Sequence, residues 1–143
     1  MLSIAADTVV VPLASEDDAA TTSDELLGQL EPGGRIVLLH VVEKAGGAPD
    51  KASVAQREER AEAIFEVARE HLASLDRTIE TEIAYGTDIA DTIAAKTSEM
   101  GADLIAISPR EAGRLSRLLT GDTALNLLTD SPVPLVVLPP PEE

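Results

Sequence analysis

The stretch that decides the fold runs from Leu104 to Ala124 and reads LIAISPREAGRLSRLLTGDTA. Leu104–Ile107 is a short apolar run, which is typical of a strand buried on both faces. Ser108-Pro109 ends it, because proline restricts the preceding residue and has no N–H to donate to a β-ladder. A loop with three arginines follows, and Gly121-Asp122-Thr123 then opens a helical stretch. A strand, a loop and a helix N-terminus in this order form a common anion-binding position of α/β proteins.

Outward from this stretch, strand and helix patterns alternate along the chain. Apolar, β-branched runs predict strands, and residues that step by three and four predict helices between them. The expected strands are Thr8–Leu13, Arg35–Val42, Arg77–Ala84, Leu104–Ile107 and Val133–Leu138. The expected helices are Ala19–Leu30, Ser53–Leu75, Ile89–Met100 and Asp122–Thr129. This alternation predicts one α/β domain over residues 1–143, with a parallel sheet covered by helices on both faces and right-handed connections.

Local signals refine the ends of these elements. Residues 14–18 are expected to form a loop after the first strand, and Ser53 with Gln56 has the spacing of a capping box. Gly101 is expected to close the third helix. Pro134 and the period-two pattern of residues 77–84 indicate that the fifth and third strands lie at the sheet edges. The PPPEE sequence at 139–143 predicts a disordered tail.

Charge and composition exclude several functions. The formal net charge is −15, from 26 acidic and 11 basic residues, which argues against binding to nucleic acid or to anionic membranes. This charge fits an ordinary acidic protein or a halophilic protein of a high-salt cytoplasm, and the three lysines with a core of Ala, Val, Leu and Ile favour the second. The absence of cysteine excludes disulfides and thiolate chemistry. No apolar run approaches the ~18 residues of a membrane span and no basic signal start is present, so a cytoplasmic location is expected.

Four motifs, in this order and spacing, resemble the universal stress protein family. They are VVVPL at 9–13, LLHVV at 38–42, GADLIAI at 101–107, and RLLTG at 117–121 followed by SPVPLVV at 131–137. The resemblance covers nearly the whole chain. It implies a Rossmann-like, adenine nucleotide alpha hydrolase-like fold with a five-stranded parallel sheet in the order 3-2-1-4-5. It also implies a homodimer built on the last strand, with an interface made by Val133, Leu135, Val136, Val137 and Leu138.

The signature of the ATP-binding members of that family is mostly absent. Those members carry an acid after the first strand, then Gly-x-x-Gly and a later Gly-Ser or Gly-Thr after the fourth. Only Gly121 matches, because the other positions are Ala14, Ser108, Glu111 and Asp122. An aspartate at a helix start takes the free N–H groups that a phosphate would need. The resemblance therefore implies a degenerate nucleotide site without cofactor or metal, comprising Pro12, Ala14, Val42, Ser108, Arg110, Glu111, Gly121, Asp122 and Thr123.

The remaining candidate residues leave alternatives open. Arg110, Arg114 and Arg117 are interpreted either as a grip for an anion or as partners of nearby acids. His40 and His71 have no catalytic constellation around them and are expected to be structural. Asp17-Asp18 is expected to be a solvated helix start rather than a metal site.

Two function classes remain, and no catalytic motif appears. The first is a non-catalytic stress-response homodimer whose protein partners the sequence does not name. The second is a nucleotide-binding protein with a rebuilt, arginine-containing phosphate loop and at most weak ATPase activity.

Overall fold

The computed structural model describes residues 5–43, 51–108 and 131–138. The expected helix Asp122–Thr129 and the expected tail at 139–143 lie outside these ranges. The strands are β1 (Thr8–Pro12), β2 (Arg35–Glu43), β3 (Thr78–Gly86), β4 (Leu104–Ile107) and β5 (Leu135–Val137). The helices are α1 (Glu16–Leu27), α2 (Lys51–His71) and α3 (Ile89–Glu99).

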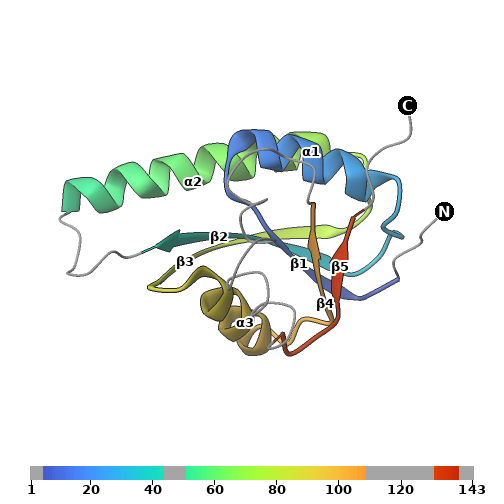
Figure 1. Cartoon of the computed structure of the whole chain (residues 1–143). Coiled ribbons are helices and arrows are strands. Elements are labelled where there is room, and N and C mark those ends of the chain that lie inside the picture. The colour runs from blue at the N-terminus through green and yellow to red at the C-terminus, as the bar shows by residue number, and fades with distance from the viewer. Residues whose placement is uncertain (1–4, 44–50, 109–130, 139–143) are drawn as a thin grey trace.

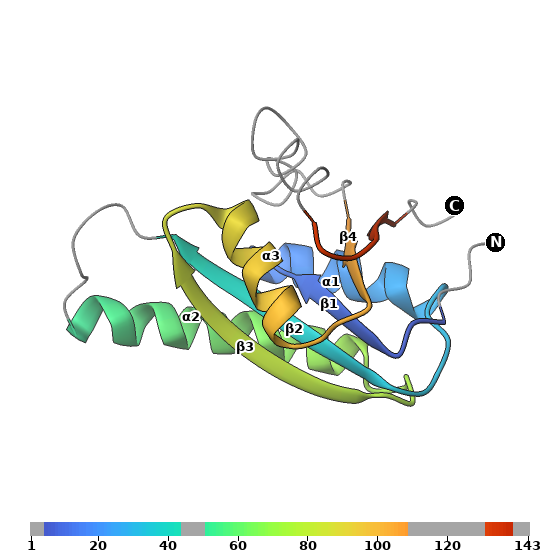
Figure 2. The same cartoon turned by 90° about the horizontal axis from the view of Figure 1, so that it is seen from below.

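The five strands form one parallel sheet in the order β3-β2-β1-β4-β5, as expected. β1 pairs with β2 along its whole length, and on its other side Val9 and Val10 pair with Leu104 and Ile105 of β4. All five residues of β1 are buried. The expected edges are confirmed, since β3 and β5 are the outer strands (Figures 1 and 2).

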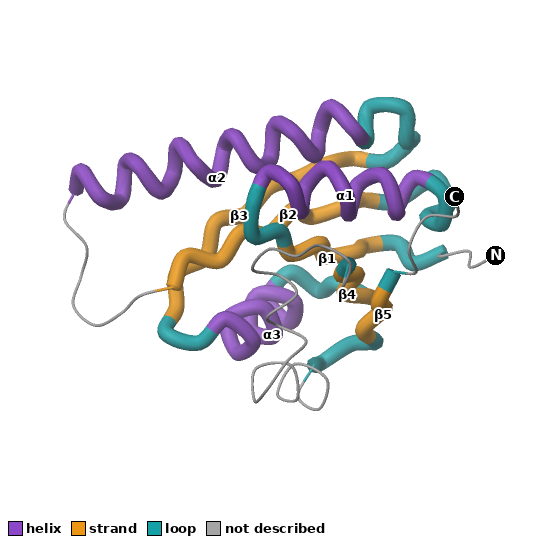
Figure 3. The backbone as a smooth tube through the Cα atoms, turned by 45° about the horizontal axis from the view of Figure 1, so that its top comes forward, coloured by secondary structure: helices purple, strands orange, loops and turns teal. Residues whose placement is uncertain are grey.

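Helices cover both faces of the sheet, which confirms the doubly wound arrangement. α1 and α2 lie on one face and α3 lies on the other (Figures 1 and 3). Alternate residues of β1 point to opposite faces. Val9 and Val11 therefore pack with Phe65 of α2 and Leu26 of α1, whereas Val10 packs in a second core on the α3 side.

Both helices of the first layer start earlier than expected. α1 begins at Glu16 rather than Ala19, because the Ser15 hydroxyl accepts a hydrogen bond from the Asp18 N–H at 3.1 Å and caps the helix. Residues 16–18 thus form the first helical turn, where acidic side chains are favoured, and not a loop. α2 begins at Lys51, so the capping box expected at Ser53 is wrong, and the helix ends at His71 before the expected Leu75.

The bounds of α3 and β5 are closer to those expected from the sequence. Asp88 caps α3 by accepting a hydrogen bond from the Asp91 N–H at 2.9 Å. Gly101 follows the helix with a φ of +64°, which confirms its expected role. β5 is shorter than expected, because Pro134 lies just before it and contributes only its carbonyl, which accepts a hydrogen bond from the Ile105 N–H at 3.0 Å.

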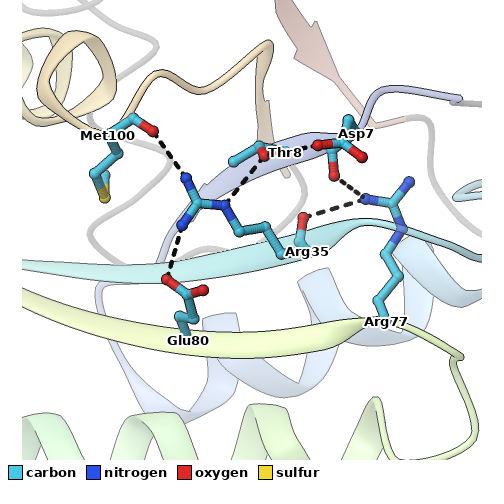
Figure 4. A network of polar contacts seen from close by, with 6 residues as sticks. All are labelled: Asp7, Thr8, Arg35, Arg77, Glu80 and Met100. Carbon is cyan, nitrogen blue, oxygen red and sulfur yellow. Dashed lines mark hydrogen bonds and ion pairs between the residues drawn. The ribbon is translucent and has the colours of Figure 1, made fainter.

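Two arginines hold the amino-terminal end of the sheet together (Figure 4). The Arg35 guanidinium donates to the Thr8 hydroxyl at 3.1 Å, to a Glu80 carboxylate oxygen at 2.9 Å and to the Met100 carbonyl at 2.8 Å. These partners belong to β1, to β3 and to the end of α3. Arg35 therefore links elements from both sides of β2.

Arg77 binds backbone carbonyls at the same end. Its guanidinium donates to the carbonyl oxygens of Glu31 at 2.8 Å, Ala6 at 2.6 Å and Asp7 at 3.1 Å, and also to that of Arg35. Gly34 lies against this cluster with a φ of +80°, and a Cβ there would collide with the Asp7 carbonyl oxygen. The chain entering β1 is thus held by the Arg77 guanidinium and by the Arg35 N–H, which donates to the Asp7 carbonyl at 2.8 Å, and Gly34 leaves room for it.

We predict that Arg77→Met destabilises the protein by about 1–3 kcal/mol, because the substitution keeps the aliphatic stem but removes the donors of four carbonyls. The control is Arg69→Met, since Arg69 is exposed and its only ion pair within the described residues, to Glu66, is long at 4.0 Å. Urea denaturation measures both. Equal midpoints for the two variants would contradict the proposed importance of Arg77.

Candidate functional site

The candidate site lies at the carboxyl ends of β1 and β2, next to the place where the strand order reverses between β1 and β4. Open α/β sheets bind ligands at this position. A small apolar hollow of about 40 Å³ occurs there. It is lined by Pro12, Leu13, Ala14, Leu39, Val41, Ile89 and Ile93. This volume corresponds to a few water molecules.

A larger hollow adjoins the first and shares Ala14, Val41 and Ile89 with it. We call it the basic cleft; its other lining residues are His40, Val42, Glu43, Arg57 and Arg60. Its volume is about 350 Å³, which lies in the usual range for small-molecule sites. Two arginines from α2 thus face the crevice at the ends of the central strands.

His40 ties the ends of β1 and β2 together beneath this cleft. Its Nδ1 donates to the Leu13 carbonyl at 2.8 Å, and the Leu13 N–H donates to the Leu39 carbonyl at 2.8 Å. Because Nδ1 carries the proton, Nε2 of the neutral ring is an acceptor. Burial lowers the pKa of His40, the hydrogen bond to Leu13 acts in the opposite direction, and the charge of Arg60 lowers it further.

The described residues include only part of the expected nucleotide site. Pro12, Ala14 and Val42 come together in the two adjoining hollows. Ser108 follows β4 and is fully buried, and its hydroxyl has no hydrogen-bond partner among the described residues. The other expected site residues lie outside the described ranges; they are Arg110, Glu111, Gly121, Asp122 and Thr123, together with Arg114 and Arg117.

Sequence reasoning missed Arg57 and Arg60. Both lie on α2 at a spacing of three residues, and Arg60 is four residues before the buried Ile64. This spacing would place them near the inner face of a helix. The sequence alone does not show that the first half of α2 lies beside the end of β2.

The acids of α1 also differ from expectation. Asp17 is exposed, but Asp18 is 0% exposed and Glu25 is 3% exposed, so this part of the helix start is not solvated. Both face the interior together with Thr22, at positions that share one side of the helix. In the described part of the chain no group of three or more His, Cys, Asp or Glu side chains is arranged to hold a metal ion.

His71 has a structural contact, as the expectation for it implied. Its Nδ1 lies 2.7 Å from a carboxylate oxygen of Asp24, which joins α2 to α1 at the surface.

Over the described ranges, no helix is both long and apolar enough to cross a membrane.

The expected interface residues occupy the β5 edge. Val137 is 43% exposed, and Val133, Leu135 and Val136 are half-buried. Leu138 is fully buried in the core on the α1 and α2 side, and its N–H donates to the Ile107 carbonyl at 2.7 Å. Its side chain is therefore part of the fold rather than of the exposed edge.

The sheet order and the crevice define a doubly wound α/β protein of the kind that binds ligands beyond the ends of its strands. A family model described as the Universal stress protein family matches residues 6–139. The chain belongs to this family. No functionally curated protein matches it.

Solved structures share the fold at low sequence identity. The universal stress protein from Archaeoglobus fulgidus in complex with dAMP has a TM-score of 0.63 and 16% identity, with 97% of this chain and 100% of that chain covered. A universal stress protein family protein from Arabidopsis thaliana with AMP bound has a TM-score of 0.63 and 16% identity, with coverages of 92% and 90%. A universal stress protein in complex with cAMP has a TM-score of 0.63 and 15% identity, with coverages of 95% and 98%.

We predict that His40 titrates below its ordinary pKa of 6.5, because burial disfavours the imidazolium form. The unfolded chain then takes up a proton before the folded chain does as the pH falls below 6.5. The contribution of His40 to the free energy of unfolding therefore decreases as the pH falls from 6.5 through the lower pKa of the folded protein. A titration of the ring resonances by NMR measures the midpoint, and His40→Gln should remove this part of the pH dependence. A midpoint at or above 6.5 would refute the prediction.

Proposed function

We propose that this chain is a non-catalytic, homodimeric stress-response protein of the cytoplasm, formed by one domain over residues 1–143, that has lost the ATP-binding signature of its family. The observation that carries the proposal is Ala14, which lines both hollows of the crevice. ATP-binding members resemble one another in having an acid at this position. A methyl group there cannot bond a ribose hydroxyl, and such a contact is worth about 1 kcal/mol or more.

The other side of the crevice supports the same proposal. Ser108 stands at a signature glycine position, and its side chain is buried there. The sequence places Glu111 and Asp122 at two further signature positions. A carboxylate at ~4 Å from a phosphate charge costs ~4 kcal/mol at an effective dielectric constant near 20.

The alternative is a nucleotide-binding universal stress protein with at most weak ATPase activity. Relatives of the same fold have been solved with dAMP, AMP and cAMP. In this alternative Arg110, Arg114 and Arg117 replace the glycine loop and supply the charge that holds the phosphates.

We predict no ATP binding by calorimetry at micromolar concentrations of Mg-ATP. The matched variant carries Ala14→Asp, Ser108→Gly, Glu111→Gly and Asp122→Ser together, which restores the signature and removes two carboxylates. This variant should gain ATP binding. Tight binding by the unaltered protein would contradict the proposal and favour the alternative.

The β5 edge supports the proposed dimer. Leu135, Val136 and Val137 form the strand, and an apolar edge strand with no charge to protect it is prone to pair with another chain. A two-fold symmetric pairing would cover the same patch on both subunits. The interface we propose comprises Val133, Leu135, Val136, Val137 and the backbone of Leu138.

We predict that Val137→Lys converts the dimer to a monomer on a sizing column, because a charge on the exposed side of an apolar edge strand opposes pairing. Val137 is the exposed residue of the strand, whereas Val136 packs against the core, so the Val137 variant should still fold. The control is Thr78→Lys, an exposed position on the opposite edge strand β3. An unchanged dimer in the Val137 variant would place the interface elsewhere.

A further inference from the structure

Arg57 and Arg60 differ from the other described basic side chains. Neither has a hydrogen bond or an ion pair within 4.0 Å among the described residues. In contrast, Arg35, Arg69 and Lys96 have carboxylate partners, and Arg77 binds carbonyls. The chain has 26 acidic and 11 basic residues, so two arginines at one cleft that pair with no described acid are unexpected.

Arg57 and Arg60 line the same cleft. Residues three apart on a helix are neighbours on its surface, so Arg57 and Arg60 project from adjacent turns of α2. Of the two, Arg57 is half-buried and Arg60 is exposed. Guanidinium groups present planar forks of N–H donors that match the oxygens of phosphate.

The rest of the cleft suits an organic group attached to such an anion. Val41, Val42 and Ile89 form apolar walls, and His40 is a further lining residue. Since His40 Nδ1 is bonded to the Leu13 carbonyl, the hydrogen-bonding atom of the ring that remains for a ligand is Nε2. In the neutral ring this atom accepts a hydrogen bond, which a ligand hydroxyl can donate.

We propose that Arg57 and Arg60 form a phosphate-binding site in the basic cleft, separate from the loop that follows β4. The ligand is a phosphomonoester or free phosphate whose oxygens accept from the two guanidinium groups. This site does not depend on whether the signature positions of the family bind ATP. Its polar lining residues come from β2 and α2, whereas Ala14 and Ile89 complete its apolar lining.

Three acidic residues lie near this site. Glu43 lines the same cleft, and Glu16 and Asp17 line a neighbouring hollow of about 270 Å³ together with Arg60. None of the three makes an ion pair with either arginine in the described structure. The net charge of −15 opposes every anion, but at about 0.15 M ionic strength screening limits that repulsion to charges within about 8 Å.

Two-dimensional NMR with inorganic phosphate as the probe tests the proposal, at constant ionic strength. We expect saturable shifts of the Arg57 and Arg60 side-chain Nε–H signals and of the His40 ring. The double variant Arg57→Met with Arg60→Met should lose about tenfold or more in affinity, because charge-assisted bonds are removed. The double variant Arg57→Lys with Arg60→Lys keeps both charges but loses the planar guanidinium groups. Its phosphate affinity should lie between that of the unaltered protein and that of the double methionine variant.

The control is Arg69→Met, which removes the same charge from an exposed position of the same helix. It should leave phosphate affinity unchanged. An equal loss in this control, shifts that do not saturate, or retained binding by the double methionine variant would overturn the proposal.

A second titration with ribose 5-phosphate distinguishes the source of the phosphate. Tighter binding than for inorganic phosphate, with the gain removed by His40→Phe, supports a phosphorylated metabolite as ligand. Equal affinity for the two probes supports free phosphate.

Discussion

The structure depends on the placement of β1 between β2 and β4. A strand in this position must satisfy its backbone hydrogen bonds on both sides and bury its side chains on both faces. The five buried residues Thr8–Pro12 meet this requirement, with valines directed to both helical layers. Because the strand order reverses beside β1, its carboxyl end opens into a crevice.

The two ends of the central strands serve different purposes. At the amino end, Arg35 donates hydrogen bonds to two side chains and one carbonyl, and Arg77 donates to four carbonyls. At the carboxyl end, the His40 side chain bonds the end of β2 to the Leu13 carbonyl, whereas Arg57 and Arg60 have no ion pair with another described residue. The amino end is thus held by side-chain hydrogen bonds, whereas the hollows described above lie at the carboxyl end.

Much of the fold could be predicted from the sequence, because its strands are β-branched runs separated by glycine and proline signals. The β4 bounds and the Asp88 and Gly101 caps of α3 follow from local chemistry. The start of α1 was mispredicted because Ser15 was not recognised as its cap. The burial of Asp18 and Glu25 is set by tertiary packing, which overrides the polar character of the residues.

The candidate site was only partly predictable. Pro12, Ala14 and Val42 were found through the resemblance to the family, and they do meet in the crevice. Arg57 and Arg60 were missed because their role depends on where α2 docks, and no local pattern encodes that position. A basic pair on a helix becomes a candidate site only when a cleft is seen beside it.

A crystal structure of the protein soaked with millimolar AMP tests the central claim most directly, since it shows where a phosphoryl group lies in the crevice. The account predicts the phosphoryl group between Arg57 and Arg60, with the apolar hollow bounded by Pro12 and Ile93 left closed. A purine inside that hollow with its phosphate beside Ser108 would contradict the account.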